Sequence, residues 1–341
     1  MKKSLMTLGI LALFVLMAYG QEKKYALYSV AFYNMENLFD TIHDEGKNDY
    51  EYLPNGTNQW NTMKYKAKLK NMSEVLSKLA TDKLPMGPAI IGVSEIENYR
   101  VLEDLLKQPA LADRGYKYIH YEGEDQRGVD CAFFYNPELF ELDHSKLLPY
   151  IYINDTIRKT RGFLIASGKI AGEKMHFIVN HWPSRGAASP ARERAGEQVR
   201  AIKDSLLRED PEAKIVIMGD MNDDPMDKSM AVSLGAKRKP NEVGPTDLYN
   251  PWWDTLRKGY GTLMYRGKWN LFDQIVFTGN LLGTDRSTLK YYKHEIFNKD
   301  FMFQKDGKYK GYPKRTQAGG VWLNGYSDHL PTIIYLIKEV K

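Results

Sequence analysis

Short apolar runs separated by turn residues recur along most of the chain, which is the pattern of a protein rich in β-strands. Each run is four to seven residues long and rich in Val, Ile, Phe or Tyr, so a buried strand is favoured over a helix. The predicted strands span residues 28–32, 89–93, 129–135, 163–166, 176–179, 214–218, 274–277 and 332–337.

Three segments show helical periodicity instead. Residues 63–79 place Leu69 and Met72 on one apolar face with charged residues opposite, and residues 101–107 and 192–208 are similar. Many strands with few helices predict two stacked sheets with helices on the outside.

Three polar stretches, residues 40–61, 237–245 and 298–320, have no regular periodicity. Long loops in a compact domain are more often functional than accidental. We therefore expect substrate specificity to lie in these loops.

The amino terminus is typical of an export signal. Two lysines precede an apolar run at residues 5–17, and Ala18 and Gly20 supply the small residues of a cleavage site. An uncleaved anchor is the alternative, but the run is shorter than the ~20 residues that a spanning helix needs. We expect residues 1–20 to be a signal peptide and residues 21–341 to be one exported domain, periplasmic or extracellular, with no membrane span.

Composition excludes several other classes. The 341 residues are 43% hydrophobic and 27% charged, which is typical of a globular protein and not of a disordered or multi-span chain. The single cysteine, Cys131, excludes an intramolecular disulfide framework and a Cys-rich zinc site. The formal net charge of +5 falls by two when Lys2 and Lys3 are removed. This balance is too mild to indicate nucleic acid by itself, although it allows an anionic substrate.

Acidic, amide and histidine residues gather just beyond the ends of the predicted strands. Any one of them is typical of an ordinary turn, helix cap or surface hydrogen bond. Strand ends that share one edge of a sandwich bring such side chains together, so we expect the whole set to form one site. The set comprises Asn34, Glu36, Glu95, Asn180, His181, Asp220, Asn222, Asp273, Ser327, Asp328 and His329.

In this order the set resembles the endonuclease/exonuclease/phosphatase superfamily, the DNase I-like group, over residues 28–337. The most specific segments are Gly-Asp-Met-Asn at 219–222 and Ser-Asp-His-Leu-Pro at 327–331. Residues 127–130 and 180–185 are similar to those of secreted bacterial nucleases in that group. The resemblance implies an α/β fold with a four-layer αββα sandwich. It also implies phosphoester hydrolysis with a divalent metal, usually Mg²⁺, with Mn²⁺ or Ca²⁺ as alternatives.

The resemblance also implies roles for the acidic residues. Glu95 matches the metal-binding glutamate, and Glu36, Asn34 and Asp328 are candidates for the same metal or its waters. Many members have Asp where this chain has Glu36. Oxygen ligands of this kind suit a hard cation such as Mg²⁺.

Other members of the set match the catalytic groups of the superfamily. Asp220 and Asn222 match the pair that orients the attacking water and binds the phosphate. His329 is expected to act as a general base or to polarise the phosphate, with Asp273 fixing its tautomer. His181 matches the histidine that protonates the leaving oxygen.

Several further residues are candidates for supporting roles. Asp130 is a candidate to orient His181. Arg127, Arg185 and Arg194 are candidates for phosphate contacts, because a guanidinium binds two oxygens at once.

Three functions remain open on the sequence alone. The first is a secreted nuclease acting on DNA or RNA, in which exposed aromatics near basic residues would stack on bases. The second is a phosphodiesterase or phosphatase for lipid or sugar phosphates, and the third is a non-catalytic binding module. The catalytic-type residues favour an enzyme, and no stable protein partner is implied. The aromatic candidates are Trp252, Trp253, Tyr265, Trp269 and Trp322, near Arg257, Arg266 and Lys268. The alternative is that most of these aromatics pack in the core or within loops.

Overall fold

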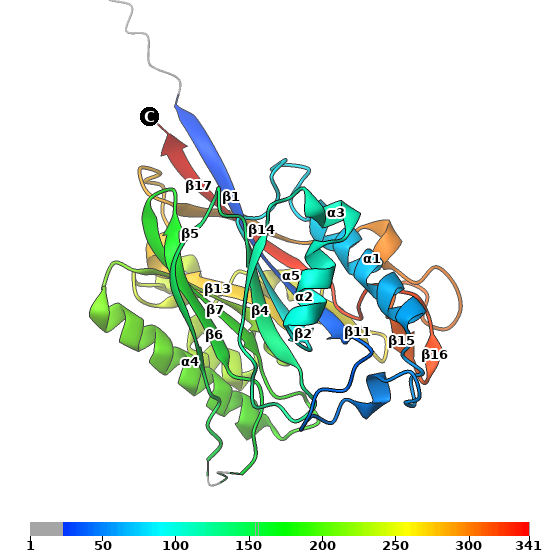
Figure 1. Ribbon diagram of the computed structural model, residues 1–341. Helices are drawn as coiled ribbons and strands as arrows, with labels where there is room; N and C mark the ends of the chain where they lie inside the picture. The colour runs from blue at the N-terminus through cyan, green and yellow to red at the C-terminus, as the bar shows by residue number, and fades with distance from the viewer. Residues whose placement is uncertain (1–22, 154, 156, 341) are drawn as a thin grey trace, which may run out of the picture.

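The computed structural model describes residues 23–340 except 154 and 156, so the predicted signal peptide lies outside the described residues. Two large sheets pack face to face, and helices cover their outer faces (Figure 1). The α/β two-sheet sandwich expected from the sequence is therefore confirmed. No helix in the described ranges is long and apolar enough to cross a membrane.

The first sheet has six strands in the order β14-β17-β1-β2-β4-β3. β1 runs parallel to β2 and antiparallel to β17. The strands are β14 (Lys290–Ile296), β17 (Thr332–Val340), β1 (Lys24–Leu38), β2 (Ile90–Ile96), β4 (Asp130–Tyr135) and β3 (Lys117–His120).

The second sheet has seven strands in the order β5-β6-β7-β8-β13-β10-β9. β7 and β8 are parallel, whereas β13 is antiparallel to β8. The strands are β5 (Glu141–Leu148), β6 (Phe163–Ile170), β7 (Glu173–His181), β8 (Lys214–Asp220), β13 (Asp273–Thr278), β10 (Leu248–Tyr249) and β9 (Ala236–Lys237). Two small hairpins, β11 (Leu263–Tyr265) with β12 (Lys268–Asn270) and β15 (Gln317–Ala318) with β16 (Val321–Trp322), lie outside the sheets.

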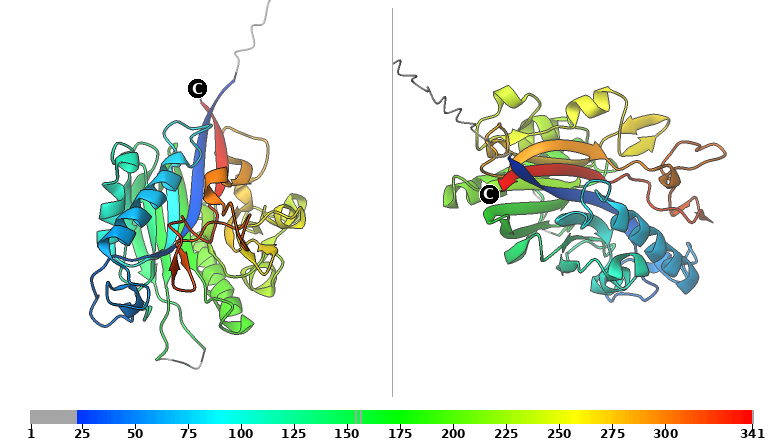
Figure 2. Two further views of the ribbon diagram at one scale, coloured as in Figure 1. Left: turned by 90° about the vertical axis from the view of Figure 1, so that its right-hand side faces the viewer. Right: turned by 90° about the horizontal axis from the view of Figure 1, so that it is seen from above.

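The two longest helices lie on opposite sides of the paired sheets (Figure 2). α1 (Thr62–Lys78) begins at Asn61, whose side chain accepts a hydrogen bond from the Lys64 backbone N–H. The other helices are α2 (Tyr99–Leu106), α3 (Pro109–Ala112), α4 (Ser189–Glu209) and α5 (Trp253–Arg257), with 3-10 turns at Tyr50–Tyr52, Pro240–Glu242, Gly279–Leu281 and Asp300–Met302 and a π-helical turn at Ser229–Leu234.

Successive side chains of the central strands point to opposite faces of the sheet, and this divides the core into layers. In β1, Val30 and Phe32 face the second sheet, whereas Ala31 and Tyr33 face helix α1. β8 alternates in the same way between the other sheet and helix α4. Side chains two residues apart point to the same face of a strand, so each central strand is buried on both faces.

The strands predicted from sequence all lie in the sheet interiors, whereas the described strands that were missed lie at sheet edges or in the small hairpins, apart from the two-residue interior strand β10. β3, β5 and β14 were not predicted because most of their residues are exposed or half-buried and none of the three contains a long apolar run. Each of the three is an edge strand of its sheet. The three predicted helices correspond to α1, α2 and α4, with ends shifted by one to three residues.

Candidate active site

The strand register brings the polar strand ends to one rim of the sandwich. β7 and β8 run parallel and end together, with His181 paired to Asp220. β13 runs the other way, so its first residue, Asp273, pairs with Asp220 at the same end. His329 lies just before β17, which is antiparallel to β1 and therefore begins beside the end of β1.

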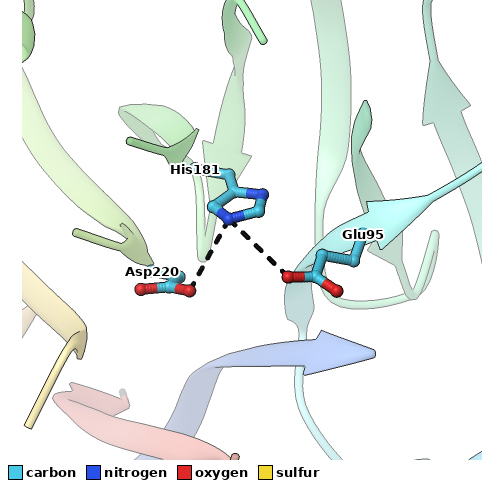
Figure 3. A group of neighbouring side chains, drawn as sticks. All are labelled: Glu95, His181 and Asp220. Carbon is cyan, nitrogen blue, oxygen red and sulfur yellow. Dashed lines mark ion pairs between the residues drawn. The ribbon is translucent and has the colours of Figure 1, made fainter. Parts of the chain in front are cut away.

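Four side chains converge on one point, namely those of Asn34, Glu95, His181 and Asp220. His181 Nε2 lies 3.7 Å from both Glu95 Oε1 and Asp220 Oδ2 (Figure 3). Asn34 Nδ2 donates to the same two carboxylate oxygens, at 3.1 and 3.0 Å. Asn34 therefore holds together two acids that come from different sheets.

His329 approaches the same point from the other side. Its Nδ1 lies 2.7 Å from Asp273 Oδ2, which orients Nε2 toward the centre, 3.9 Å from Asp220 Oδ2. Ser327 Oγ accepts the His329 backbone N–H and donates to the Asn34 backbone oxygen. The two histidines thus flank Asp220.

Several residues of the site have a left-handed backbone, although none is glycine. Glu36, Asn37, Glu95 and Asn222 have φ between 45° and 61°. This conformation costs free energy for a side chain with a Cβ, and such strain gathers at functional sites. At Asn222 the turn allows its backbone N–H to donate to Asp220 Oδ1, which leaves Oδ2 facing the centre.

Burial and neighbouring charges shift the pKa values of the ionisable groups in the centre in opposite directions. Burial, followed by the Asp273 and Glu95 charges, raises the pKa of Asp220. Burial, helped by nearby Arg161 and Arg127, lowers the pKa of His181 well below its usual range. For His329, burial opposes the charged form, but the carboxylates of Asp273, Asp328 and Asp220 outweigh it and raise the pKa. These surroundings therefore favour the neutral form of His181 and the charged form of His329.

The donor set fits a divalent cation. Glu95, His181 and Asp220 each offer one ligand atom, and these atoms lie within 4.8 Å of one another. Asp220, Asp273 and His329 form a second such group within the described residues. Carboxylate oxygens with a neutral imidazole are ordinary ligands for divalent metals, and two buried acids favour a counter-charge.

Glu36 and Asp328, which were expected to be metal ligands, contact Arg315. Arg315 Nε donates to Glu36 Oε1 at 2.8 Å, and the Thr316 backbone N–H donates to Glu36 Oε2 at 2.7 Å. A terminal Arg315 nitrogen lies 3.0 Å from Asp328 Oδ2. Both oxygens of Glu36 are therefore engaged away from the Glu95 centre, whereas Asp328 also lies 3.9 Å from His329 Nε2.

The arginines expected to bind phosphate differ in their surroundings. Arg185 pairs with Asp223, Asp224 and Asp227, so it holds the turn after β8. Arg127 is half exposed, 3.8 Å from an Asp125 carboxylate oxygen.

Two further arginines differ from the sequence expectation: Arg194 was a candidate for phosphate contact, and Arg161 was not a candidate. Arg194 contacts the Ile151 backbone oxygen and Glu197 on the surface of α4. The sequence did not single out Arg161, which is buried and donates to the Trp182 backbone oxygen at 2.9 Å beside His181. No motif surrounds Arg161, so its position depends on the fold.

Asp130, which was expected to orient His181, has other partners. Its carboxylate accepts the Gly123 backbone N–H at 3.0 Å and lies 3.3 Å from His120 Nε2. Among the described residues, His181 Nδ1 has no hydrogen-bond partner. That expectation was wrong, because Asp130 faces β3 at the start of β4.

The aromatic candidates for base stacking are mostly packed inside the protein. Trp252 is fully buried and donates to the Ile275 backbone oxygen, so this candidate is a core residue and not a surface for base stacking. Trp269 and Trp322 pack against the helix side of the first sheet. Tyr265 is 61% exposed and is therefore available to a substrate.

Two facing sheets with helices outside and a carboxylate–imidazole centre at one rim define the DNase I-like class of phosphoester hydrolases. The chain belongs to the Endonuclease/Exonuclease/phosphatase family, whose model matches residues 29–338. No curated protein matches the chain in sequence.

Solved structures share the fold at low sequence identity. A Bacteroides thetaiotaomicron endonuclease/exonuclease/phosphatase family protein is 16% identical, with a TM-score of 0.56, and the match covers 93% of this chain and 97% of that one. D. rerio TDP2 complexed with single strand DNA product is 16% identical, with a TM-score of 0.53 and coverage of 91% and 99%. The B. thetaiotaomicron mannosyl-6-phosphatase Bt3783 is 16% identical, with a TM-score of 0.54 and coverage of 91% and 99%. At these identities the likeness establishes the fold alone.

Proposed function

We propose that this protein is an exported, Mg²⁺-dependent phosphodiesterase that cleaves DNA or RNA as an endonuclease. A surface beside His329 supports nucleic acid as the substrate. We call this surface the basic rim and define it as residues 263–270 and 304–315. The two segments touch where the Gly267 backbone N–H donates to the Tyr312 hydroxyl at 2.6 Å. A β-bridge between Leu263 and His329 joins the rim to the centre.

The basic rim concentrates positive charge that the whole chain does not have. It contains one acidic residue, Asp306, against seven basic ones: Arg266, Lys268, Lys305, Lys308, Lys310, Lys314 and Arg315. Tyr265 and Tyr309 are exposed within it. Cations that follow a phosphate backbone, with exposed aromatics that stack on bases, are the usual means of binding a nucleic-acid strand. The single strand DNA product bound by the related TDP2 fold supports the same substrate class.

The residues of the centre have separable roles in the proposed reaction. Glu95 and Asp220 would hold the cation, which neutralises phosphate charge when bound. Asp220, oriented by the Asn222 backbone and by Asn34, would position the attacking water in line with the phosphorus. His329, held by Asp273, would donate a hydrogen bond from Nε2 to a phosphate oxygen as negative charge develops there. His181, the other imidazole beside Asp220, would assist the leaving oxygen.

The test is a substrate panel with purified protein. Single-stranded DNA, circular duplex DNA, RNA, a phospholipid and a hexose 6-phosphate are each incubated with Mg²⁺ and, in parallel, with EDTA. We expect cleavage of a nucleic acid, including the circular substrate that an exonuclease cannot attack, and none with EDTA or with Asp220→Ala. Release of phosphate or headgroup from only the lipid or the sugar phosphate would refute the nuclease proposal. Secretion is tested separately by sequencing the amino terminus of the exported protein.

A further inference from the structure

A cavity of about 390 Å³ opens beside the centre, between the loop of residues 50–60 and residues 315–320. We call it the side cavity. Figure 1 shows these two segments at the same end of the molecule, the first in dark blue and the second leading through β15 to β16. Its volume lies within the range of about 300–1,000 Å³ that is usual for small-molecule sites.

The side cavity adjoins the centre through a lining residue that contacts Glu95. Glu36 and Asn37 line it, and the Asn37 backbone N–H donates to Glu95 Oε2 at 2.8 Å. Arg315, which also lines the cavity, is fixed by Glu36 on one side and Asp328 on the other. A chain whose phosphate lies at Glu95 would therefore place its neighbouring unit in this cavity.

The walls combine flat aromatic rings with groups that form hydrogen bonds. Tyr52 lines the cavity and stacks on Phe39 with ring centroids 4.2 Å apart and planes inclined by 7°, so its orientation is fixed. Tyr309 lines it from the basic rim and is half exposed. Asn58 and Gln317, two half-buried residues with amide side chains, also line the cavity.

We propose that the side cavity is a subsite for the nucleobase of the nucleotide adjoining the scissile phosphate. The inference rests on the proposed nuclease function and adds the position of the substrate. A planar base matches aromatic walls, and amide side chains can pair with the donor and acceptor edges of a base. An acyl chain would offer these amide side chains no hydrogen-bond partner, which is unfavourable.

The test compares two phosphodiesters that differ only in whether a base is present. Bis(p-nitrophenyl) phosphate carries no nucleobase, whereas a single-stranded oligonucleotide does. Asn58→Ala and Gln317→Ala should each raise KM for the oligonucleotide by about 5- to 10-fold, the effect of about one hydrogen bond, and leave kcat/KM for the small diester unchanged. Asn55→Ala is the matched control, because Asn55 is an exposed amide in the same loop that does not line the cavity.

A second measurement does not depend on catalysis. Isothermal titration of a nucleoside 5′-monophosphate in EDTA should show weaker binding to Asn58→Ala and Gln317→Ala than to the wild type or Asn55→Ala. Equal binding to all four proteins, or variants that affect both diesters alike, would overturn the subsite. If no substrate is cleaved, the nuclease proposal fails, while the calorimetry still decides whether the cavity binds a base.

Discussion

The pairing of Asp273 with His329 allows a sharp test of the catalytic geometry. Asp273→Asn keeps the size of the side chain but removes the charge that faces His329 Nδ1 at 2.7 Å. Asp273 is fully buried, so no solvent replaces the lost interaction. The asparagine amide can also donate to Nδ1, which would present the wrong imidazole tautomer to the phosphate.

The size of the effect follows from that one contact. A hydrogen bond to a charged group contributes roughly 1.5–3 kcal/mol. If this stabilisation is used only in the transition state, kcat should fall by about 10- to 150-fold while KM changes little.

The assay is initial-rate kinetics on an oligonucleotide, with circular dichroism to verify folding. Asp143→Asn is the control, because Asp143 is exposed on the edge strand β5. A folded Asp273→Asn protein whose kcat stays within about threefold of the wild type would show that this pair does not support catalysis.

Three further predictions concern stability and the substrate surface. Burial lowers the pKa of His176 to about 4, so the unfolded chain takes up a proton that the folded chain excludes. The stability that this provides is complete above about pH 6.5 and is lost as the pH falls toward 4. At pH 5 the free energy of unfolding, measured with urea, should be about 1–2 kcal/mol lower than above pH 6.5, and His176→Gln should abolish this difference. The same pH dependence of stability in wild type and His176→Gln would contradict the assignment. Gly92→Ala would place a Cβ 2.6 Å from Met218 Sδ between the sheets and should cost about 1–3 kcal/mol, whereas a neutral effect would mean that the sheets can separate locally. Replacing Lys308 and Lys310 with Glu should raise KM for single-stranded DNA. It should also reduce the slope of log affinity against log salt concentration by about 1.4, and the same slope as in the wild type would show that neither lysine contacts the DNA.

The sequence was sufficient for the sandwich because the central strands are buried on both faces. A strand of this kind has a short apolar run in its sequence whichever strands it pairs with, as residues 214–218 do for β8. Edge strands such as β14, with the sequence KYYKHEI, need only partial burial, so their pattern does not distinguish them from loops. Their place depends on a neighbour, β17, that follows about forty residues later.

The centre was predictable for a similar reason, and its surroundings were not. Glu95, His181 and Asp220 each follow a recognisable strand, so the topology brings them together. Arg315 lies in a polar loop with no periodicity, and its contact with Glu36 joins residues 279 positions apart. A contact over that distance depends on the folded loop, which composition does not reveal.

Magnesium binding tests the central claim most directly, because Glu95 and Asp220 come from different sheets and should hold one cation together. Isothermal titration with Mg²⁺ should show binding to the wild type and to Glu45→Gln, an exposed control. Binding should be at least ~10-fold weaker for Glu95→Gln and for Asp220→Asn. Unchanged Mg²⁺ affinity in both of those variants would contradict the account.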